Sequence, residues 1–177
     1  MRTQSFAKRP VGFTLLELIM VMALLGILAV SVAPRFQSTG SVVEYTYQSR
    51  LISSLRTMQQ RAMNDTRSGF CFFVNVFGGS NSSFGPPTLN YANSNRANTC
   101  ATTIDSSEDA QYLVANIDEM AADNVTITDG AGTISFNSMG CPATASGNCG
   151  SSKRIELRGE TTIAVCIESQ GYIHACD

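Results

Sequence analysis

The sequence predicts an α+β protein: a long N-terminal helix, with a membrane-spanning first half and an amphipathic second half, packed on a small antiparallel β-sheet head with disulfides. Three observations carry this prediction. An apolar run fills residues 13–33, apolar residues at helical spacing follow it, and the distal part combines strand-like segments with six cysteines. The expected organisation is a leader at 1–12, two helix halves at 13–34 and 35–67, and a head at 68–177.

The leader is basic: it carries Arg2, Lys8 and Arg9 and no acidic residue. The apolar run begins directly after Gly12 and is not followed by a small-residue cleavage site, whereas an ordinary secretory signal has its apolar segment before the cut. We expect the positive leader to stay on the cytoplasmic side of the membrane.

The apolar run is long enough for a membrane span but contains one carboxylate, Glu17. As a helix, it would reach about 32 Å at roughly 1.5 Å per residue, close to the ~30 Å hydrocarbon core of a bilayer. Keeping an acid there costs about 2.5–3.5 kcal/mol on insertion scales, so Glu17 is a candidate functional residue that needs a partner, which a neighbouring subunit would supply. The alternative is that Glu17 only complements the positive N-terminal end of its own helix, worth about 0.3–1 kcal/mol.

The second helix half is predicted from a stripe at i, i+4, i+7 and i+11, with Ile52 and Met63 beside it. The stripe consists of Leu51, Leu55, Met58 and Ala62. We expect the helix to pass Pro34 with a kink and to end within residues 65–69, where weak helix formers and a glycine occur.

The head is predicted to form an antiparallel sheet from segments rich in β-branched and aromatic residues. The predicted strands are 70–77, 125–128, 133–137, 154–158, 162–168 and 172–175, with hairpin turns at 129–130 and 169–171. Residues 105–120 are ambiguous, because 105–108 resembles a capping box, whereas 112–117 fits a strand, which we favour. Residues 78–100 are rich in Gly, Ser, Asn and Pro and predict a long irregular surface loop, either a contact site or a cysteine-tethered flap.

The cysteines all lie beyond the apolar run, and an even number in an exported domain indicates disulfides. We predict Cys141–Cys149 because these residues flank a short loop, and Cys166–Cys176 because they flank a predicted hairpin. Cys71–Cys100 then follows by elimination. A zinc site is the alternative, but the spacing is not typical of zinc ligands, and His174 is the single histidine.

Charge argues against a nucleic-acid-binding function. Without the leader the chain has a net charge of −5, and residues 70–177 hold four basic and eleven acidic residues. Proteins that bind nucleic acids need a basic surface, so we expect no nucleic-acid partner. We also expect no cofactor and no metal.

The segment Gly12-Phe13-Thr14-Leu15-Leu16-Glu17-Leu18 resembles the processing motif of type IV prepilins, and Gly26 and Pro34-Arg35-Phe36 continue the resemblance. The resemblance implies cleavage between Gly12 and Phe13 by a prepilin peptidase, N-methylation of Phe13, and an assembly role for Glu17 with the N-terminal amine of an adjacent subunit. An α-amine has a reference pKa of about 7.7–8, and methylation leaves it able to carry a charge. In this chain Pro10 and Val11 stand between the basic residues and Gly12, where the family usually has a basic residue directly before the glycine.

Residues 54–63 resemble the Leu-Arg-x-x-Gln-x-x-Ala run of minor pilins and pseudopilins of the GspH/FimT kind, and 136–142 and 167–173 look like paired glycine-containing elements of that head. With residues 34–36, the resemblance is closest to minor pilins of the mannose-sensitive haemagglutinin (MSHA) pilus. It implies a structural minor subunit that acts in pilus initiation or biogenesis and in attachment.

The resemblance also implies partners and a location. The partners are other pilins of the same fibre, the prepilin peptidase/methyltransferase and the inner-membrane assembly platform. The chain would cross the inner membrane once, with its head in the periplasm, before entering a fibre at the cell surface.

Two other functions stay open. One is a pseudopilin of a type II secretion system, and the other is a tip adhesin that binds carbohydrate through Tyr91, Asn93, Asn95 and Asn98. An enzyme is not expected, because His174 has no nucleophile motif around it and no phosphate-binding loop occurs.

Overall fold

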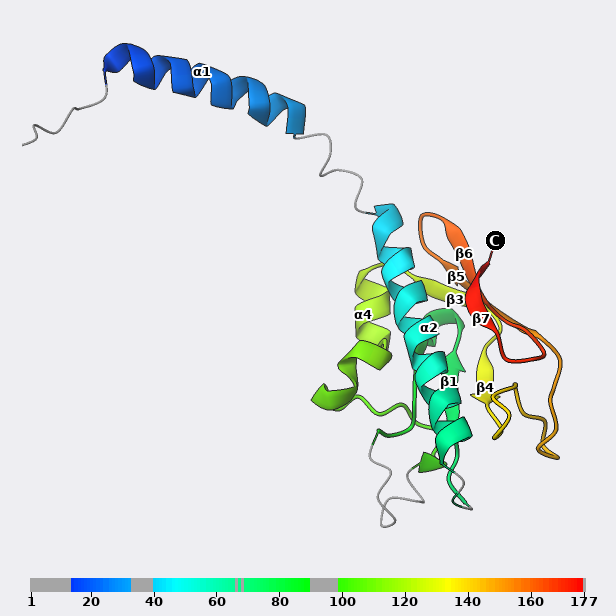
Figure 1. Ribbon diagram of the computed structural model, residues 1–177. Helices are drawn as coiled ribbons and strands as arrows, with labels where there is room; N and C mark the ends of the chain where they lie inside the picture. The colour runs from blue at the N-terminus through cyan, green and yellow to red at the C-terminus, as the bar shows by residue number, and fades with distance from the viewer. Residues whose placement is uncertain (1–13, 33–39, 66, 68, 90–98, 177) are drawn as a thin grey trace, which may run out of the picture. The chain divides into compact units, whose positions relative to one another are not determined.

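The computed structural model describes residues 14–32, 40–65, 67, 69–89 and 99–176. The chain divides into two units, Met1–Thr39 and Gly40–Asp177, each described by itself (Figure 1). The leader and the expected kink at Pro34 lie outside the described residues.

The first unit contains α1 (Leu15–Val32), a helix of 18 residues in which Glu17 is the only charged residue. At about 1.5 Å per residue it is roughly 27 Å long. Its large apolar side chains between Leu15 and Leu28 are 47–77% exposed, so α1 exposes apolar surface on all its sides within its unit. The described part of the chain contains no helix with both the length and the hydropathy needed to cross a membrane.

The second unit is organised around α2 (Gly40–Asn64). All four residues of the predicted stripe are buried, with Leu51, Leu55 and Met58 fully covered. Tyr47 extends the stripe toward the start of the helix, whereas Met63 is 43% exposed and lies outside it. The helix ends at Asn64, directly before the weak helix formers of residues 65–69 near which its end is predicted.

The strands form two antiparallel sheets. The first sheet has the order β2-β1-β4 and contains β1 (Phe73–Phe77), β2 (Ser83–Gly85) and β4 (Gly132–Ser135). The second has the order β3-β5-β6-β7. It contains β3 (Thr126–Asp129), β5 (Lys153–Arg158), β6 (Thr162–Ile167) and β7 (Ile173–Cys176). The α+β class and the antiparallel pairing are confirmed, but the head has two small sheets where one was expected.

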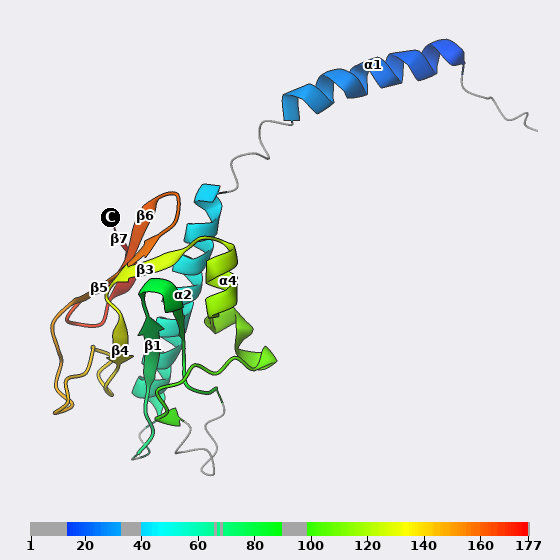
Figure 2. The ribbon, with the colours of Figure 1, turned by 180° about the vertical axis from the view of Figure 1, so that it is seen from behind.

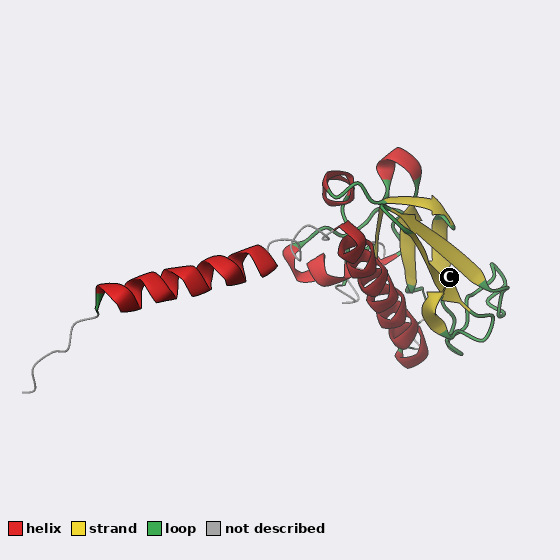
Figure 3. Ribbon diagram, turned by 90° about the horizontal axis from the view of Figure 1, so that it is seen from above, coloured by secondary structure: helices red, strands yellow, loops and turns green. Residues whose placement is uncertain are grey.

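The core lies where α2 packs on both sheets. Buried side chains of β1, β5, β6 and β7 form one cluster with the stripe of α2. Figures 1 and 2 show α2 between the strands β5–β7 and α4 (Ile117–Ala122), and Figure 3 shows it running along the side of the strands. The apolar faces of both sheets therefore pack against the same helix, α2.

The predicted strand at 112–117 is wrong. Residues Glu108–Leu113 form a 3₁₀ helix (η4), α4 follows, and only Ala115 makes an isolated bridge, to Phe84. Leu113, Val114 and Ala115 are buried in this segment, whereas Tyr112 and Ile117 are exposed, and α4 buries Met120. The carboxylate of Asp105 accepts the N–H groups of Ser107 and Leu89, at 3.0 and 3.3 Å, and so turns the loop before η4 without capping it.

The predicted hairpin at 129–130 is also wrong, although a sharp turn is present. β3 pairs with β5 and β4 pairs with β1, so residues 129–130 carry the chain from one sheet to the other. Gly130 has φ +79°, and a Cβ there would overlap the backbone of Arg154. Glycine is needed for this change of sheet, because an L side chain would be both strained and without space.

The described part of the loop predicted at 78–100 contains regular structure that the sequence did not predict. Residues Gly79–Asn81 form a 3₁₀ turn (η2), and β2 pairs with β1, with Phe84 opposite Val76. Phe84 is fully buried and draws this segment into the core. Residues 90–98, with the predicted sugar-binding residues Tyr91, Asn93, Asn95 and Asn98, lie outside the described part of the chain.

The three predicted disulfides are present, and they involve all six cysteines. Cys71–Cys100 joins the chain just before β1 to the segment that follows β2, with Cα atoms 4.9 Å apart. Cys141–Cys149 closes the loop after β4, and Cys166–Cys176 joins β6 to β7.

Glu44 is a buried carboxylate that fixes the start of α2 to the turn between β5 and β6. It is 1% exposed, and its Oε1 accepts the N–H of Thr161 at 3.0 Å, while a Cβ on Gly159 would overlap this carboxylate. Its Oε2 is buried without a hydrogen-bond partner among the described residues. Burial raises the pKa of Glu44, but the backbone N–H groups that donate to it, led by that of Thr161, bring the pKa below its usual 4.5.

We predict that Glu44→Gln flattens the dependence of stability on pH. Because folding lowers the pKa of this carboxyl, its ionised form stabilises the head above the unfolded pKa of 4.5, and this contribution is lost as the pH falls through the folded pKa. Denaturant unfolding between about pH 7 and about pH 3 measures the effect. The wild-type protein should lose more stability in acid than Glu44→Gln. The control Glu156→Gln, at a partly exposed position, should lose as much as the wild type. If Glu44→Gln loses as much stability in acid as the wild type, the assignment is wrong.

Candidate functional site

The first candidate site is the start of α1. Gly12 and Phe13 lie outside the described residues, and Glu17 lies in the first turn of the helix. Thr14 Oγ1 accepts the backbone N–H of Glu17 at 3.2 Å, and the Thr14 carbonyl accepts the N–H of Leu18. Thr14 therefore caps the helix, and the spacing Thr-x-x-Glu, a capping-box pattern, was the available signal for it.

Glu17 is the one charged group on this apolar helix, and its side chain is exposed within its unit. It lies on the third helical position, so its carboxylate is within one turn of the N-terminal end of α1. The geometry leaves the carboxylate accessible to a cation that approaches the beginning of the helix.

The run Leu-Arg-x-x-Gln-x-x-Ala in α2 positions the head. Arg56 donates to the carbonyl of Ile173 in β7 at 2.7 Å. Gln59 Nε2 donates to the carbonyls of Gly140 and Gly171, at 2.6 and 2.5 Å. These glycines belong to the two glycine-containing segments singled out in the sequence, and both have positive φ. Gln59 thus brings together two loops that are about thirty residues apart along the chain.

The contact between these loops leaves no room for side chains. A Cβ on Gly171 would overlap the carbonyl oxygen of Gly140, and a Cβ on Gly140 would approach Met63 Sδ within 2.7 Å. The segments 136–142 and 167–173 are therefore held by backbone contact, with the Gln59 amide between them. These residues are structural, and they place β7 and the Cys141–Cys149 loop on α2.

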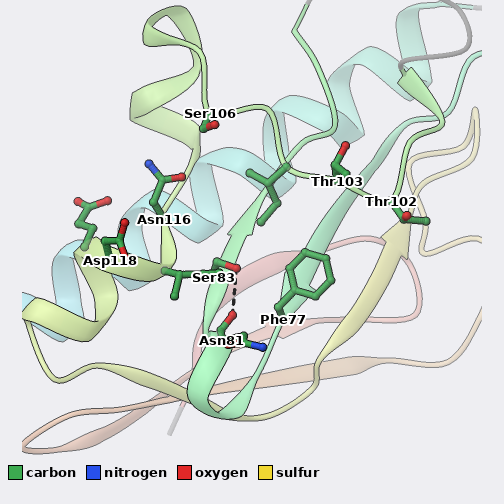
Figure 4. Close-up of a pocket in the computed structure, with 11 residues that line it drawn as sticks. Phe77, Asn81, Ser83, Thr102, Thr103, Ser106, Asn116 and Asp118 are labelled. Carbon is green, nitrogen blue, oxygen red and sulfur yellow. Dashed lines mark hydrogen bonds between the residues drawn. The ribbon is translucent and has the colours of Figure 1, made fainter.

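The second candidate site is a cleft of about 840 Å³ in the head, lined by the end of β1, by η2 and β2, by residues 102–106 and by the start of α4. Figure 4 shows Phe77 between Thr102 and Ser83, with Asn116 and Asp118 across from it. Phe77 and Ile117 are 41% and 46% exposed. Six uncharged polar residues complete most of the lining: Asn81, Ser83, Thr102, Thr103, Ser106 and Asn116.

The walls of the cleft are fixed by hydrogen bonds to the first sheet. The buried side chain of Asn75 donates to the carbonyls of Ala101 and Thr103, at 3.2 and 3.1 Å. The bridge between Phe84 and Ala115 places the segment that leads into α4 beside β2. The cleft is therefore part of the folded head.

The electrostatics of the cleft are neutral to acidic. Among the described residues that line it, none is basic, and the charged ones are Asp118 and Glu119. Glu119 is paired with Arg50 at 2.6 Å, which leaves Asp118 as the net charge. Sequence reasoning missed this cleft because its residues come from separate segments and share no motif.

His174 lies on the hairpin β6–β7, stacked on Tyr172 with ring centroids 4.8 Å apart. Its Nε2 is 3.2 Å from Glu168 Oε1. The Ala175 carbonyl and then the Glu168 carboxylate raise the pKa of His174 above its usual 6.5. This is the geometry of a surface ion pair, and no cluster of three or more metal-binding side chains occurs in the described ranges.

Comparisons with protein-family models, with curated proteins and with solved structures gave no match to this chain.

We predict that Gln59→Ala lowers the free energy of unfolding by about 1–3 kcal/mol, because the two carbonyls lose their donor in a partly buried position. Gln60→Ala, at the exposed neighbouring position, is the matched control and should change stability by no more than about 0.5 kcal/mol. Denaturant unfolding with the disulfides intact measures both. Equal stabilities for the two variants would show that Gln59 does not hold the loops.

Proposed function

We propose that the protein is a structural minor subunit of a type IV pilus, closest to the MSHA type, that acts in pilus initiation and biogenesis. The proposed precursor is cut between Gly12 and Phe13, and Phe13 is then methylated. The observation that carries this proposal is the juxtaposition of Gly12-Phe13 with an apolar helix whose first turn holds one carboxylate, Glu17. In this account residues 13–34 span the membrane before assembly and lie in the fibre core afterwards.

The proposed mechanism is an ion pair formed between subunits. Cleavage gives Phe13 a free amine that is largely protonated near neutral pH. A unit charge pair at about 4 Å is worth about 1 kcal/mol in water and about 4 kcal/mol at an effective dielectric constant of about 20. In an apolar surrounding, the ammonium of one subunit therefore stabilises the Glu17 carboxylate of the next and orients the incoming helix.

The head supports the proposal through its construction. Its helix α2 is part of the core, so the head begins directly at Gly40, and three disulfides close its loops. Disulfides are typical of domains that work outside the cytoplasm. A surface fibre subunit requires an apolar helix for assembly and a stable head that faces the outside. This chain has an apolar helix followed by a head closed by three disulfides.

We predict that Glu17→Ala and Glu17→Gln are inserted and cleaved normally but enter fibres at least tenfold less than the wild type, because tenfold corresponds to about 1.4 kcal/mol of lost ion-pair energy. Glu17→Asp, which keeps the charge, should recover part of the incorporation. The measurement compares the cleaved chain in membranes with the chain in sheared surface fibres.

Leu18→Ala is the matched control, since it removes apolar contact beside Glu17 without removing charge. Incorporation of Glu17→Ala at the wild-type level would leave only the interaction with the dipole of its own helix and would overturn the assembly role. A processed chain that is absent from surface fibres but required for export of secreted proteins would instead indicate a secretion pseudopilin.

A further inference from the structure

We propose that the cleft beside Phe77 binds a neutral oligosaccharide. The site is distinct from residues 12–17, and the proposal does not depend on assembly of the chain into a fibre. It is also distinct from the loop residues that the sequence suggested for sugar binding.

The size and the apolar part of the cleft fit a sugar chain. A volume of about 840 Å³ lies within the range of about 300–1,000 Å³ that small-molecule sites occupy. Phe77 ends β1 with its side chain 41% exposed, the one exposed position of a strand that is otherwise buried. An exposed aromatic ring offers a flat apolar surface for the C–H face of a pyranose, and Ile117 adds apolar surface in the same cleft.

The polar part supplies groups that hydroxyls can use. The side chains of Asn81, Thr102 and Asn116 make no hydrogen bond with other described residues, and they line the cleft around Phe77 (Figure 4). Amides and hydroxyls both donate and accept, which is what the hydroxyl groups of a sugar require. The Asn75 side chain ties the backbone at Ala101 and Thr103 to β1, so this part of the cleft wall is already ordered before a ligand binds.

The charge of the cleft selects against other ligands. The described lining contains no basic residue, and Asp118 gives the cleft a net negative charge. This charge would repel phosphate, sulfate and sialic acid groups. A peptide that adds a strand needs an open sheet edge. Here β2 is paired with β1 on one side and bridged to Ala115 on the other, so the edge beside the cleft is occupied.

The test is binding of the full chain, in a zwitterionic detergent without a sugar headgroup, to an array of neutral oligosaccharides of glucose, galactose, mannose and N-acetylhexosamines with their sialylated and sulfated counterparts. The neutral oligosaccharide that binds best is then titrated against each variant. We expect Phe77→Ala and Asn116→Ala to weaken its affinity at least tenfold. Tyr172→Ala, which removes an aromatic ring that is 65% exposed outside the cleft, should change it less than twofold.

Intact disulfides and an unchanged thermal transition identify the variants that fold. Asn116→Ala keeps the test decisive if Phe77→Ala does not fold, because the Asn116 side chain is exposed and makes no described hydrogen bond. The proposal is overturned if no neutral oligosaccharide binds, if the array shows a preference for sialylated or sulfated sugars, or if the folded cleft variants bind as tightly as Tyr172→Ala.

Discussion

The head depends on one helix that buries its apolar stripe against two sheets and at the same time satisfies their backbone groups. Sheets of three and four strands are too small to form separate cores, and both place their apolar residues against α2. Polar side chains of α2 also donate hydrogen bonds to backbone carbonyls of several separate segments of the head. Gln48 donates to the Ala164 carbonyl in β6, Arg50 to the Val114 carbonyl before α4, and Arg61 to the Leu89 carbonyl. Such contacts fix the position of each segment along the helix, because a carbonyl without its donor would be costly to bury.

The proposed function places a second constraint of the same kind at the other end of the chain. Glu17 lies on a helix with no polar face, and a carboxylate in an apolar surrounding needs a partner. In α2 the partners of the polar side chains belong to the same chain. For Glu17 we propose that the partner comes from another subunit, which would make assembly the step that satisfies the charge. The cleft in the head lies in a different unit from Glu17, so recognition and assembly would use separate surfaces.

Local signals in the sequence were sufficient for much of the fold. The stripe of α2 follows from its spacing, and the hairpin β6–β7 from a turn between two apolar strands. Two disulfide pairs follow from the loop and the hairpin that their cysteines flank, and Cys71–Cys100 follows by elimination. Non-local contacts decided the rest. Gly130 marks a turn whether the chain forms a hairpin or changes sheets, and only the pairing of β3 with β5 distinguishes these outcomes. Residues 112–117 have strand-like composition, but tertiary burial of Leu113 and Met120 favours helical turns. The cleft had no signal, because its residues meet only after the first sheet, residues 102–106 and α4 are in place.

The central claim is that this chain becomes a fibre subunit by cleavage after Gly12. Intact mass and N-terminal sequencing of the protein isolated from sheared surface filaments test it most directly. The account predicts a chain that begins at Phe13, carries one added methyl group, and lacks six hydrogens because its three disulfides are formed. Filaments that contain the chain with residues 1–12 still attached would contradict it.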